Sequence, residues 1–235
     1  MSSGAQQAQP VAQIKNLSFC WSRSSDPVLT ISDWQVYRGE RWCIYGPSGS
    51  GKTTLLNLLT GLLMPTQGTI SILGEAINNL NGARRDRLRA DHLGYIFQQF
   101  NLLPYLSVFD NVCLPVQLST PRKTKSLQHF ASIEAEAEHW LGALDLPQDR
   151  WHQSVLQLSI GQQQRVAGAR ALMGAPELII ADEPTSALDV DNAKRFIEAF
   201  NHACQEQQTA LIMVSHDQSF HDQFDQLWAL DQEAR

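Results

Sequence analysis

The chain has 235 residues, of which 43% are hydrophobic and 18% charged, and a net charge of −6. This length allows one sizeable domain with a large core, which excludes a disulfide-stapled mini-protein, and the apolar runs are far too short to span a bilayer. The acidic balance argues against a surface that coats nucleic acid, so no nucleic-acid partner is expected.

Neither the amino terminus nor the cysteines indicate export. Residues 1–10 are rich in Ala, Gln and Ser and lack the basic-then-apolar pattern of a signal peptide, so a frayed tail and a cytoplasmic location are expected. The cysteines show neither metal-ligand nor CxxC spacing, which is typical of reduced thiols in a cytosolic protein. They are Cys20, Cys43, Cys113 and Cys204.

The first part of the chain is predicted to be rich in strands. Segments 11–17, 28–34 and 41–45 carry β-branched and aromatic residues, and the last of them runs into a glycine-rich turn and a helix over 53–60. A turn at 64–68 then precedes a short strand over 69–73. The basic run 84–89 contains Asp86 and is interpreted as a solvated face.

The middle third is predicted to be mostly helical, including a helical pattern over 126–144. After it, helices and apolar strands alternate, which indicates a parallel α/β sheet. The segments are a helix over 159–173, a strand over 178–181, a helix over 192–206 and strands over 210–214 and 227–230. The middle helices are therefore interpreted as an insertion into one α/β core, and no further regulatory domain is expected after the last strand.

Eight residues between the third strand and the following helix fit the pattern G-x-x-x-x-G-K-[ST], a phosphate-binding loop. They are Gly46, Pro47, Ser48, Gly49, Ser50, Gly51, Lys52 and Thr53. Backbone N–H groups of such a loop and the start of the helix bind phosphate, the lysine reaches the β and γ phosphates, and the threonine hydroxyl binds Mg²⁺. Thr54 is assigned to nucleotide binding as well.

Two carboxylates, Asp182 and Glu183, follow directly on the apolar strand 178–181. Because ligand sites of parallel sheets form at the carboxyl edge, both are expected beside the phosphate loop. Asp182 is predicted to bind Mg²⁺, and Glu183 to polarise the water that attacks the γ-phosphate. Such a pair alone could be a solvated strand end, but together with the phosphate loop it predicts nucleoside triphosphate hydrolysis.

Segment 158–165, Leu-Ser-Ile-Gly-Gln-Gln-Gln-Arg, lies just upstream of the carboxylates. It resembles the signature motif of ATP-binding cassette (ABC) ATPases, and the resemblance covers nearly the whole chain. It implies an α/β fold: a P-loop NTPase core with a parallel sheet, an N-terminal antiparallel β subdomain and an inserted α-helical subdomain. In this single ABC ATPase domain over 1–235, the core is expected at about 11–93 and 166–235 and the insertion at about 98–165.

Further positions resemble the motifs of this family. Gln98 is similar to the Q-loop glutamine, assigned to catalysis and metal binding, and segment 186–189 is similar to the D-loop. His216 resembles the switch histidine, which acts in catalysis with Glu183 and Lys52, and Trp21 falls where the family stacks an aromatic side chain on adenine. Singly, these could be surface or core residues, but their order and spacing favour the functional interpretation.

The signature resemblance implies a site shared by two copies. Ser159 is expected to cap a helix and Gly161 to leave its backbone open, so that with Gln162 the helix start binds a γ-phosphate across a homodimer interface. Ile160 stands where glycine is commonest in the family, which is a departure at the signature loop. Hydrolysis is still expected.

The resemblance also implies a partner: an integral membrane permease on a separate chain, with this chain peripheral on the cytoplasmic face. Phe100, Leu102, Leu103 and Tyr105 look exposed and are assigned to the groove that receives a coupling helix, with ordinary core as the alternative. The stretch 91–111 looks most like the MacB, LolD and FtsE group.

Three other functions remain open. A soluble ABC ATPase of translation or repair usually has two cassettes or a long coiled-coil insertion, for which this chain has no room. A P-loop kinase would leave the signature segment without a role. An ABC ATPase that signals through a membrane partner without transport is indistinguishable by sequence.

Overall fold

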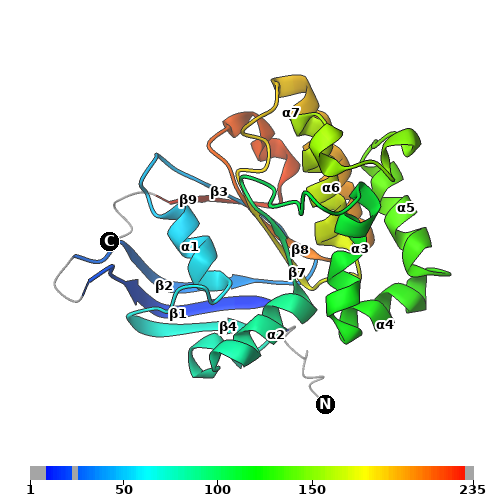
Figure 1. The fold of residues 1–235 in the computed structure, drawn as a ribbon. Coiled ribbons are helices and arrows are strands. Elements are labelled where there is room, and N and C mark those ends of the chain that lie inside the picture. Colours follow the sequence, from blue (N-terminus) through cyan, green and yellow to red (C-terminus); the bar gives the residue numbers. More distant parts are fainter. Residues whose placement is uncertain (1–8, 23–25, 231–235) are drawn as a thin grey trace, which may run out of the picture.

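The computed structural model describes residues 9–22 and 26–230, and Figure 1 shows two sheets with most of the helices gathered beside one of them. Residues 1–8 of the tail predicted over 1–10 lie outside the described residues, as do residues 231–235. None of the helices in the described ranges has the length and hydropathy that a membrane span requires.

The strands form a four-stranded sheet of order β2-β1-β4-β5 and a five-stranded sheet of order β6-β7-β8-β3-β9. They are β1 (Ala12–Phe19), β2 (Leu29–Val36), β3 (Arg41–Tyr45), β4 (Gln67–Ile72), β5 (Glu75–Ala76), β6 (Leu93–Ile96), β7 (Leu178–Asp182), β8 (Ala210–Val214) and β9 (Gln226–Ala229). All pairings in the first sheet are antiparallel and all pairings in the second are parallel. The α/β fold with a parallel and an antiparallel sheet is confirmed.

Alternate residues of the parallel strands face two separate cores. In β7, Ile179 and Ala181 pack with helices α3, α5, α6 and α7, whereas Leu178 and Ile180 pack with α1 and the antiparallel sheet. This follows from the pleat, which points successive side chains to opposite faces. Every residue of β7 and β8 is buried, as expected for parallel strands that are covered on both faces.

Seven α-helices connect these strands within the described residues. They are α1 (Lys52–Leu59), α2 (Gly82–His92), α3 (Val108–Leu118), α4 (Thr120–His129), α5 (Ile133–Ala143), α6 (Ile160–Leu172) and α7 (Val190–Glu206). Short 3₁₀ turns are η1 (Ile77–Asn79), η2 (Gln148–Arg150), η3 (Val155–Gln157) and η4 (Gln218–Gln223). Helix α6 continues through residue 165, where the end of the inserted subdomain is predicted.

The helical pattern predicted over 126–144 is divided between two helices, α4 and α5. Helix α4 ends where Phe130 adopts extended backbone, with φ −125° and ψ 152°. Helix α5 begins after Ser132, whose hydroxyl accepts a hydrogen bond from the Ala135 N–H at 3.1 Å. A serine cap inside an otherwise helical pattern starts a new helix because its side chain satisfies a donor of the next first turn.

Glu177, which precedes β7, joins two helices to the amino-terminal end of the parallel sheet. Its Oε2 lies 3.0 Å from His92 Nδ1 at the end of α2, and its Oε1 accepts a hydrogen bond from Lys125 Nζ of α4 at 2.6 Å. Burial of the carboxyl raises its pKa, but the bonds with His92 and Lys125 outweigh burial and lower the pKa to about 2. Glu177 is therefore a stabilising anion at neutral pH.

We expect Glu177→Gln to lower the free energy of unfolding at pH 7 by about 1–2 kcal/mol, less than the full pKa shift implies, because solvent screens the partly exposed pair. A lowered folded-state pKa gives stability that is complete above the unfolded-state pKa of about 4.5 and is lost as the pH falls towards about 2. Urea unfolding should therefore show a difference that is present at pH 7 and pH 5 and shrinks below about pH 4. If the difference in the free energy of unfolding does not shrink at low pH, the prediction is wrong. Glu198→Gln is the control, because Glu198 is exposed on α7.

Candidate active site

The loop between β3 and α1 carries the predicted phosphate-binding residues. Helix α1 follows Gly51, whose φ of 98° is left-handed, and no side chain caps its start. The other α-helices in the described residues each have a side-chain cap, from Asn81, Ser107, Ser119, Ser132, Ser159 and Asp189. Since the first turn of a helix leaves backbone N–H groups unsatisfied, α1 presents its donors to an anion.

Two glycines allow this loop to lie close to its neighbours. A Cβ atom on Gly46 would lie 2.4 Å from the Leu230 carbonyl oxygen, and one on Gly51 would lie 2.8 Å from Leu29 Cδ2. Both distances are shorter than real contacts, so a larger residue at either position would displace the loop from β2 and from the end of β9. The missing side chains at these two positions therefore let the loop pack closely against Leu29 and Leu230.

The Lys52 ammonium lies inside the loop. Its Nζ donates to the carbonyl oxygens of Gly46 at 2.8 Å and Pro47 at 2.9 Å, and the residue is 8% exposed. An ammonium has three donors, so one remains for a phosphate oxygen. The buried Ser50 hydroxyl has no hydrogen-bond partner among the described residues, and such an atom is costly unless a ligand or water satisfies it.

Asp182, at the end of β7, lies beside the first turn of α1. Burial, and then the charge of Glu183, raise the pKa of Asp182, and interaction with the Thr53 hydroxyl and the charge of Lys52 opposes the shift. A carboxylate and a hydroxyl in contact are hard oxygen ligands of the kind that Mg²⁺ prefers. A bound cation would also offset the cost of burying the Asp182 charge.

Glu183 follows in a left-handed conformation, with φ 44°. Its backbone N–H donates to the Val214 carbonyl oxygen at 3.0 Å, which joins the carboxyl ends of β7 and β8. Its Oε2 lies 3.5 Å from Nδ1 of His216, whose side chain is 64% exposed. Non-glycine residues with positive φ are uncommon and cluster at functional sites, where the surrounding structure holds them.

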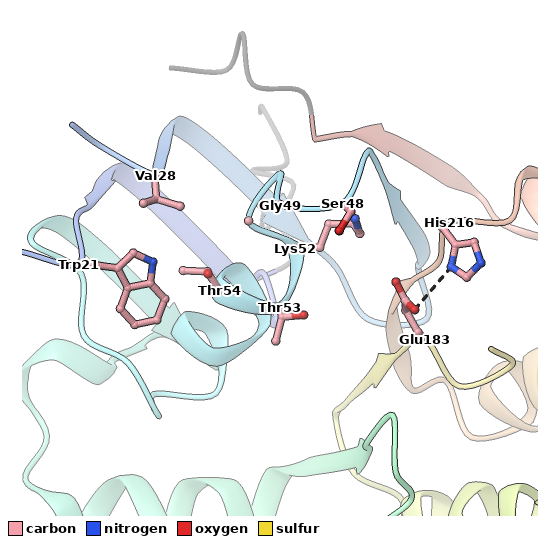
Figure 2. A pocket seen from close by; sticks show the side chains of 10 residues that line it. Trp21, Val28, Ser48, Gly49, Lys52, Thr53, Thr54, Glu183 and His216 are labelled. Carbon is pink, nitrogen blue, oxygen red and sulfur yellow. Dashed lines mark ion pairs between the residues drawn. The ribbon is translucent and has the colours of Figure 1, made fainter. Parts of the chain in front are cut away.

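A pocket of about 550 Å³ joins these groups. Figure 2 shows Trp21 at one end, the Glu183–His216 pair at the other and the phosphate-binding residues between them. The Trp21 side chain is 65% exposed and packs edge-on against Phe19, with ring centroids 5.1 Å apart. The lining residues are Trp21, Val28, Ser48, Gly49, Gly51, Lys52, Thr53, Thr54, Glu183 and His216.

Several predicted site residues do not line this pocket. Gly46, Pro47 and Ser50 belong to the phosphate-binding loop without lining the pocket, and Asp182 contacts the Thr53 hydroxyl but is not a lining residue. Gln98 is exposed in the turn that follows β6 and also lies outside the lining. The pocket of one chain is therefore lined by some, but not all, of the residues predicted to bind nucleotide, bind metal or act in catalysis.

The predicted signature residues lie at the start of α6, which is also outside the pocket of their own chain. The Ser159 hydroxyl accepts from the Gln162 N–H at 3.3 Å, and the Gln162 side chain accepts from the Ser159 N–H at 3.0 Å. A Cβ on Gly161 would lie 3.2 Å from Leu188 Cδ2, so the D-loop approaches this glycine closely. Ile160 is 55% exposed beside them.

The segment assigned to a partner groove is less exposed than predicted. Phe100 is 6% exposed and lies in the core with α3 and α6, so its assignment to a docking surface is wrong. Leu102 packs partly buried against the same core, and the Leu103 N–H and carbonyl both bond with the Asn111 side chain, at 2.7 and 3.0 Å. Tyr105, at 78% exposed, lies on the surface.

An apolar groove of about 440 Å³ lies instead between α2, β6 and α3. Leu62 and Leu118 on its walls are 54% and 71% exposed, and Leu114 and Phe97 also line it. Sequence reasoning missed this groove because its walls come from segments far apart in the chain. It also missed Val28 in the nucleotide pocket, because an apolar residue at a strand start carries no distinctive signal.

Comparisons with known proteins agree with this geometry. The family model described as ABC transporter matches residues 29–186. The chain is 41% identical to the lipoprotein-releasing system ATP-binding protein LolD of Hydrogenovibrio crunogenus, over 81% of this chain and 80% of that protein. It resembles the dimeric structure of MJ0796, a bacterial ABC transporter cassette, with a TM-score of 0.79, 31% identity and 94% of each chain covered.

A second structure of MJ0796, a dimeric post-hydrolysis state bound to ADP and phosphate, matches with a TM-score of 0.73 and 32% identity over 88% of each chain. Sequence, fold and pocket thus agree on one family and one activity. The chain belongs to the ABC transporter family and is an ATP-binding subunit with ATPase activity.

Proposed function

We propose that this chain binds ATP with Mg²⁺ in the pocket between Trp21 and His216, and that its hydrolysis drives a membrane permease on a separate chain. The observation that carries the proposal is the convergence of an adenine platform, a phosphate loop and the Glu183–His216 pair on one pocket. Each part corresponds to one step in holding or cleaving a nucleoside triphosphate.

The phosphate loop holds the triphosphate mainly through backbone N–H groups at the start of α1, and the Lys52 ammonium adds a point charge. The buried Ser50 hydroxyl and the Thr53–Asp182 contact fit a phosphate with a hard divalent cation beside it. Thr53, Asp182 and Gln98 would hold Mg²⁺, which when bound neutralises the charge on the β and γ phosphates.

Glu183 acts as the general base that orients the attacking water, and His216 holds its carboxylate and contacts the γ-phosphate. The left-handed backbone of Glu183 and its bond to Val214 aim this carboxylate from the edge of the sheet. The exposed His216 can move with the nucleotide, which suits a residue that reports the phosphate state.

Catalysis takes place in a homodimer in which Ser159, Gly161 and Gln162 of one copy complete the pocket of the other. The start of α6 lies outside the pocket of its own chain, and the similar MJ0796 cassette is a dimer in two structures. The capping box that Ser159 and Gln162 form orients the first turn of α6 as an anion site.

Trp21 binds the adenine base by stacking. We expect Trp21→Ala to raise the Kd for ATP about tenfold, in the range of roughly 1–3 kcal/mol per stacked base, and Trp21→Phe to retain most of the affinity because a flat aromatic face remains. Titration with a fluorescent ATP analogue measures this. Trp151→Phe, which changes a buried tryptophan of the helical region, is the control, and a wild-type Kd in Trp21→Ala would exclude stacking.

The permease docks a helix in the apolar groove between α2 and α3. Exposed leucines on the walls of a concave surface normally have a partner, and an amphipathic helix is the element that fills such a groove. Tyr105, Leu102 and Leu103 remain a secondary proposal for the same interface, with Phe100 excluded by its burial.

We expect Leu118→Asp to release the chain from membranes and to leave the Kd for ATP unchanged, because a charge in the groove opposes docking without touching the nucleotide pocket. Membrane flotation with an ATP-binding assay measures both effects. Leu127→Asp is the control, because Leu127 is 50% exposed on α4 and does not line the groove. Undiminished membrane association of Leu118→Asp would exclude the groove.

By similarity to LolD, the complex belongs to the group that includes lipoprotein-releasing systems, and the chain lies on the cytoplasmic face of the membrane. The chain is divided into a core over about 11–93 and 166–235 and a helical subdomain over about 98–165. A rotation of one part against the other would close the groove. Purification from gently solubilised membranes with ATP tests this function. An integral membrane partner and phosphate release support it, and repeated recovery of the chain alone would favour a soluble ABC ATPase.

A further inference from the structure

A strained turn follows Gln98. Phe100 and Asn101 both have positive φ angles, 58° and 47°. The Phe100 N–H donates to the Phe97 carbonyl at 2.9 Å, and the Asn101 N–H donates to the Gln99 carbonyl at 2.6 Å. The second bond spans only three residues and closes a γ-turn centred on Phe100. Positive φ is unfavourable for a bulky aromatic residue, so the surrounding structure must hold this turn.

One buried arginine of α6, Arg170, holds the turn from the other side. Its Nη1 donates to the Asn101 carbonyl at 2.8 Å and its Nη2 donates to the Phe100 carbonyl at 2.5 Å. Arg170 is 9% exposed, and burial lowers its pKa to about 10, which keeps it charged at neutral pH. The planar guanidinium presents two parallel donors that match two adjacent carbonyls, a match that a lysine cannot make.

The position of Arg170 in the fold connects this turn to the dimer site. Helix α6 begins at the Ser159–Gln162 capping box and carries Arg170 near its other end. The segment after the turn is held separately, because the Asn111 side chain of α3 bonds to both backbone groups of Leu103. The Gln98 loop is therefore attached to α6 through Arg170 and to α3, one wall of the apolar groove, through Asn111.

We propose that Arg170 is a positioning residue for Gln98, and that through it a displacement of α6 is transmitted to the Gln98 loop. This rests on the proposed function, in which Gln98 reaches the Mg²⁺ site. Gln98 lies outside the pocket in this structure, so it must move to act, and a strained turn held by two charge-assisted bonds can change between two arrangements. Without the two hydrogen bonds from Arg170 to the Phe100 and Asn101 carbonyls, the turn relaxes, and Gln98 is no longer held in position.

The test is Arg170→Lys in the full chain, which keeps the charge but replaces the fork with a single point donor. We expect kcat for phosphate release to fall about tenfold and the KM for ATP to change less than about twofold, because Gln98 acts on the transition state rather than on ground-state binding. Hydrogen exchange of the Phe100 and Asn101 amides should accelerate. That readout needs no ATPase activity, so it tests the contact even if wild-type chain releases no phosphate and the proposed function fails.

A double-mutant cycle separates positioning from general stability. In a Gln98→Ala background, Arg170→Lys should cause less than about a twofold further loss of kcat, because the residue it positions is already absent. Arg41→Lys is the matched control: Arg41 of β3 also makes a two-bond fork, to the Asp225 carboxylate, and it lines neither the nucleotide pocket nor the apolar groove. It should lower stability, leave kcat per folded molecule unchanged and leave exchange at the turn unchanged.

Equal losses of kcat in the wild-type and Gln98→Ala backgrounds, or unchanged exchange of the Phe100 and Asn101 amides, would overturn the proposal. If Arg170→Lys does not fold, Asn101→Gly provides a second arm, because glycine has more backbone freedom than asparagine and therefore holds the turn less firmly in one conformation. It should fold and lower kcat about threefold in the wild-type background only, and an equal loss in Gln98→Ala would again overturn the proposal.

Discussion

Glu183→Gln is expected to reduce steady-state phosphate release by about 10²–10⁴-fold, the range for a lost general base, while the Kd for ATP stays within about twofold of wild type. Glutamine keeps the size and the hydrogen-bonding shape of the side chain but cannot accept the proton of the attacking water. Because the phosphate loop is untouched, ATP still binds, and a nucleotide that binds without being cleaved should trap a closed dimer.

Phosphate release in the presence of the membrane partner and size-exclusion chromatography with ATP measure these effects. Glu198→Gln, which removes an exposed carboxylate from α7, should turn over like wild type. Undiminished turnover in Glu183→Gln would remove Glu183 from the role of base. The Glu183–His216 contact of 3.5 Å gives a second check, since His216→Ala should also lower kcat with little change in ATP binding.

Lys52→Gln is expected to weaken ATP binding by at least about 100-fold, because charge-assisted bonds to phosphate and the compensation of phosphate charge in a partly buried site are both lost. The ammonium already lies between the Gly46 and Pro47 carbonyls, so little rearrangement precedes its contact with the phosphates. The variant also loses both of these loop bonds. Its own stability must therefore be measured beside its affinity.

Equilibrium titration with ATP and thermal unfolding without nucleotide separate the two effects. Lys194→Gln, at an exposed position on α7, should bind ATP like wild type. If Lys52→Gln binds ATP normally, the loop does not hold phosphate through Lys52. If Lys52→Gln unfolds before the titration can be made, Lys52→Arg keeps the charge and can still donate to the loop carbonyls, so it should recover the fold. It should not recover the affinity, because the wide planar guanidinium does not reproduce the point contact of an ammonium with phosphate.

Local patterns were sufficient for much of the fold. The runs at 41–45 and 210–214 coincide with β3 and β8, because short apolar segments bounded by turn residues have few other stable states. The helix predicted after Ser159 is confirmed with its capping box. Local patterns did not predict the break within 126–144, where Ser132 starts a second helix. They also did not predict α2, because its polar sequence has no clear apolar face.

In the candidate site too, some features can be predicted from local sequence patterns and others cannot. The phosphate loop and the two carboxylates are recognisable in sequence because their chemistry requires particular residues at contiguous positions. Contiguous residues do not show whether a side chain is buried. Phe100 looks exposed between polar neighbours, yet it packs with α3 and α6 in the core. Whether an apolar side chain is core or surface depends on which distant segments cover it.

The sequence by itself therefore determined the family, the ATP-binding loop and the carboxylate pair, because these depend on local backbone geometry and on fixed chemical roles. The tertiary structure alone decided where the apolar groove lies and which residues share the nucleotide pocket. It also decided that Arg170 holds the turn at Phe100, 70 residues away in sequence. Such contacts arise from the packing of two cores on opposite faces of one sheet, and no local pattern specifies which segments that packing brings together.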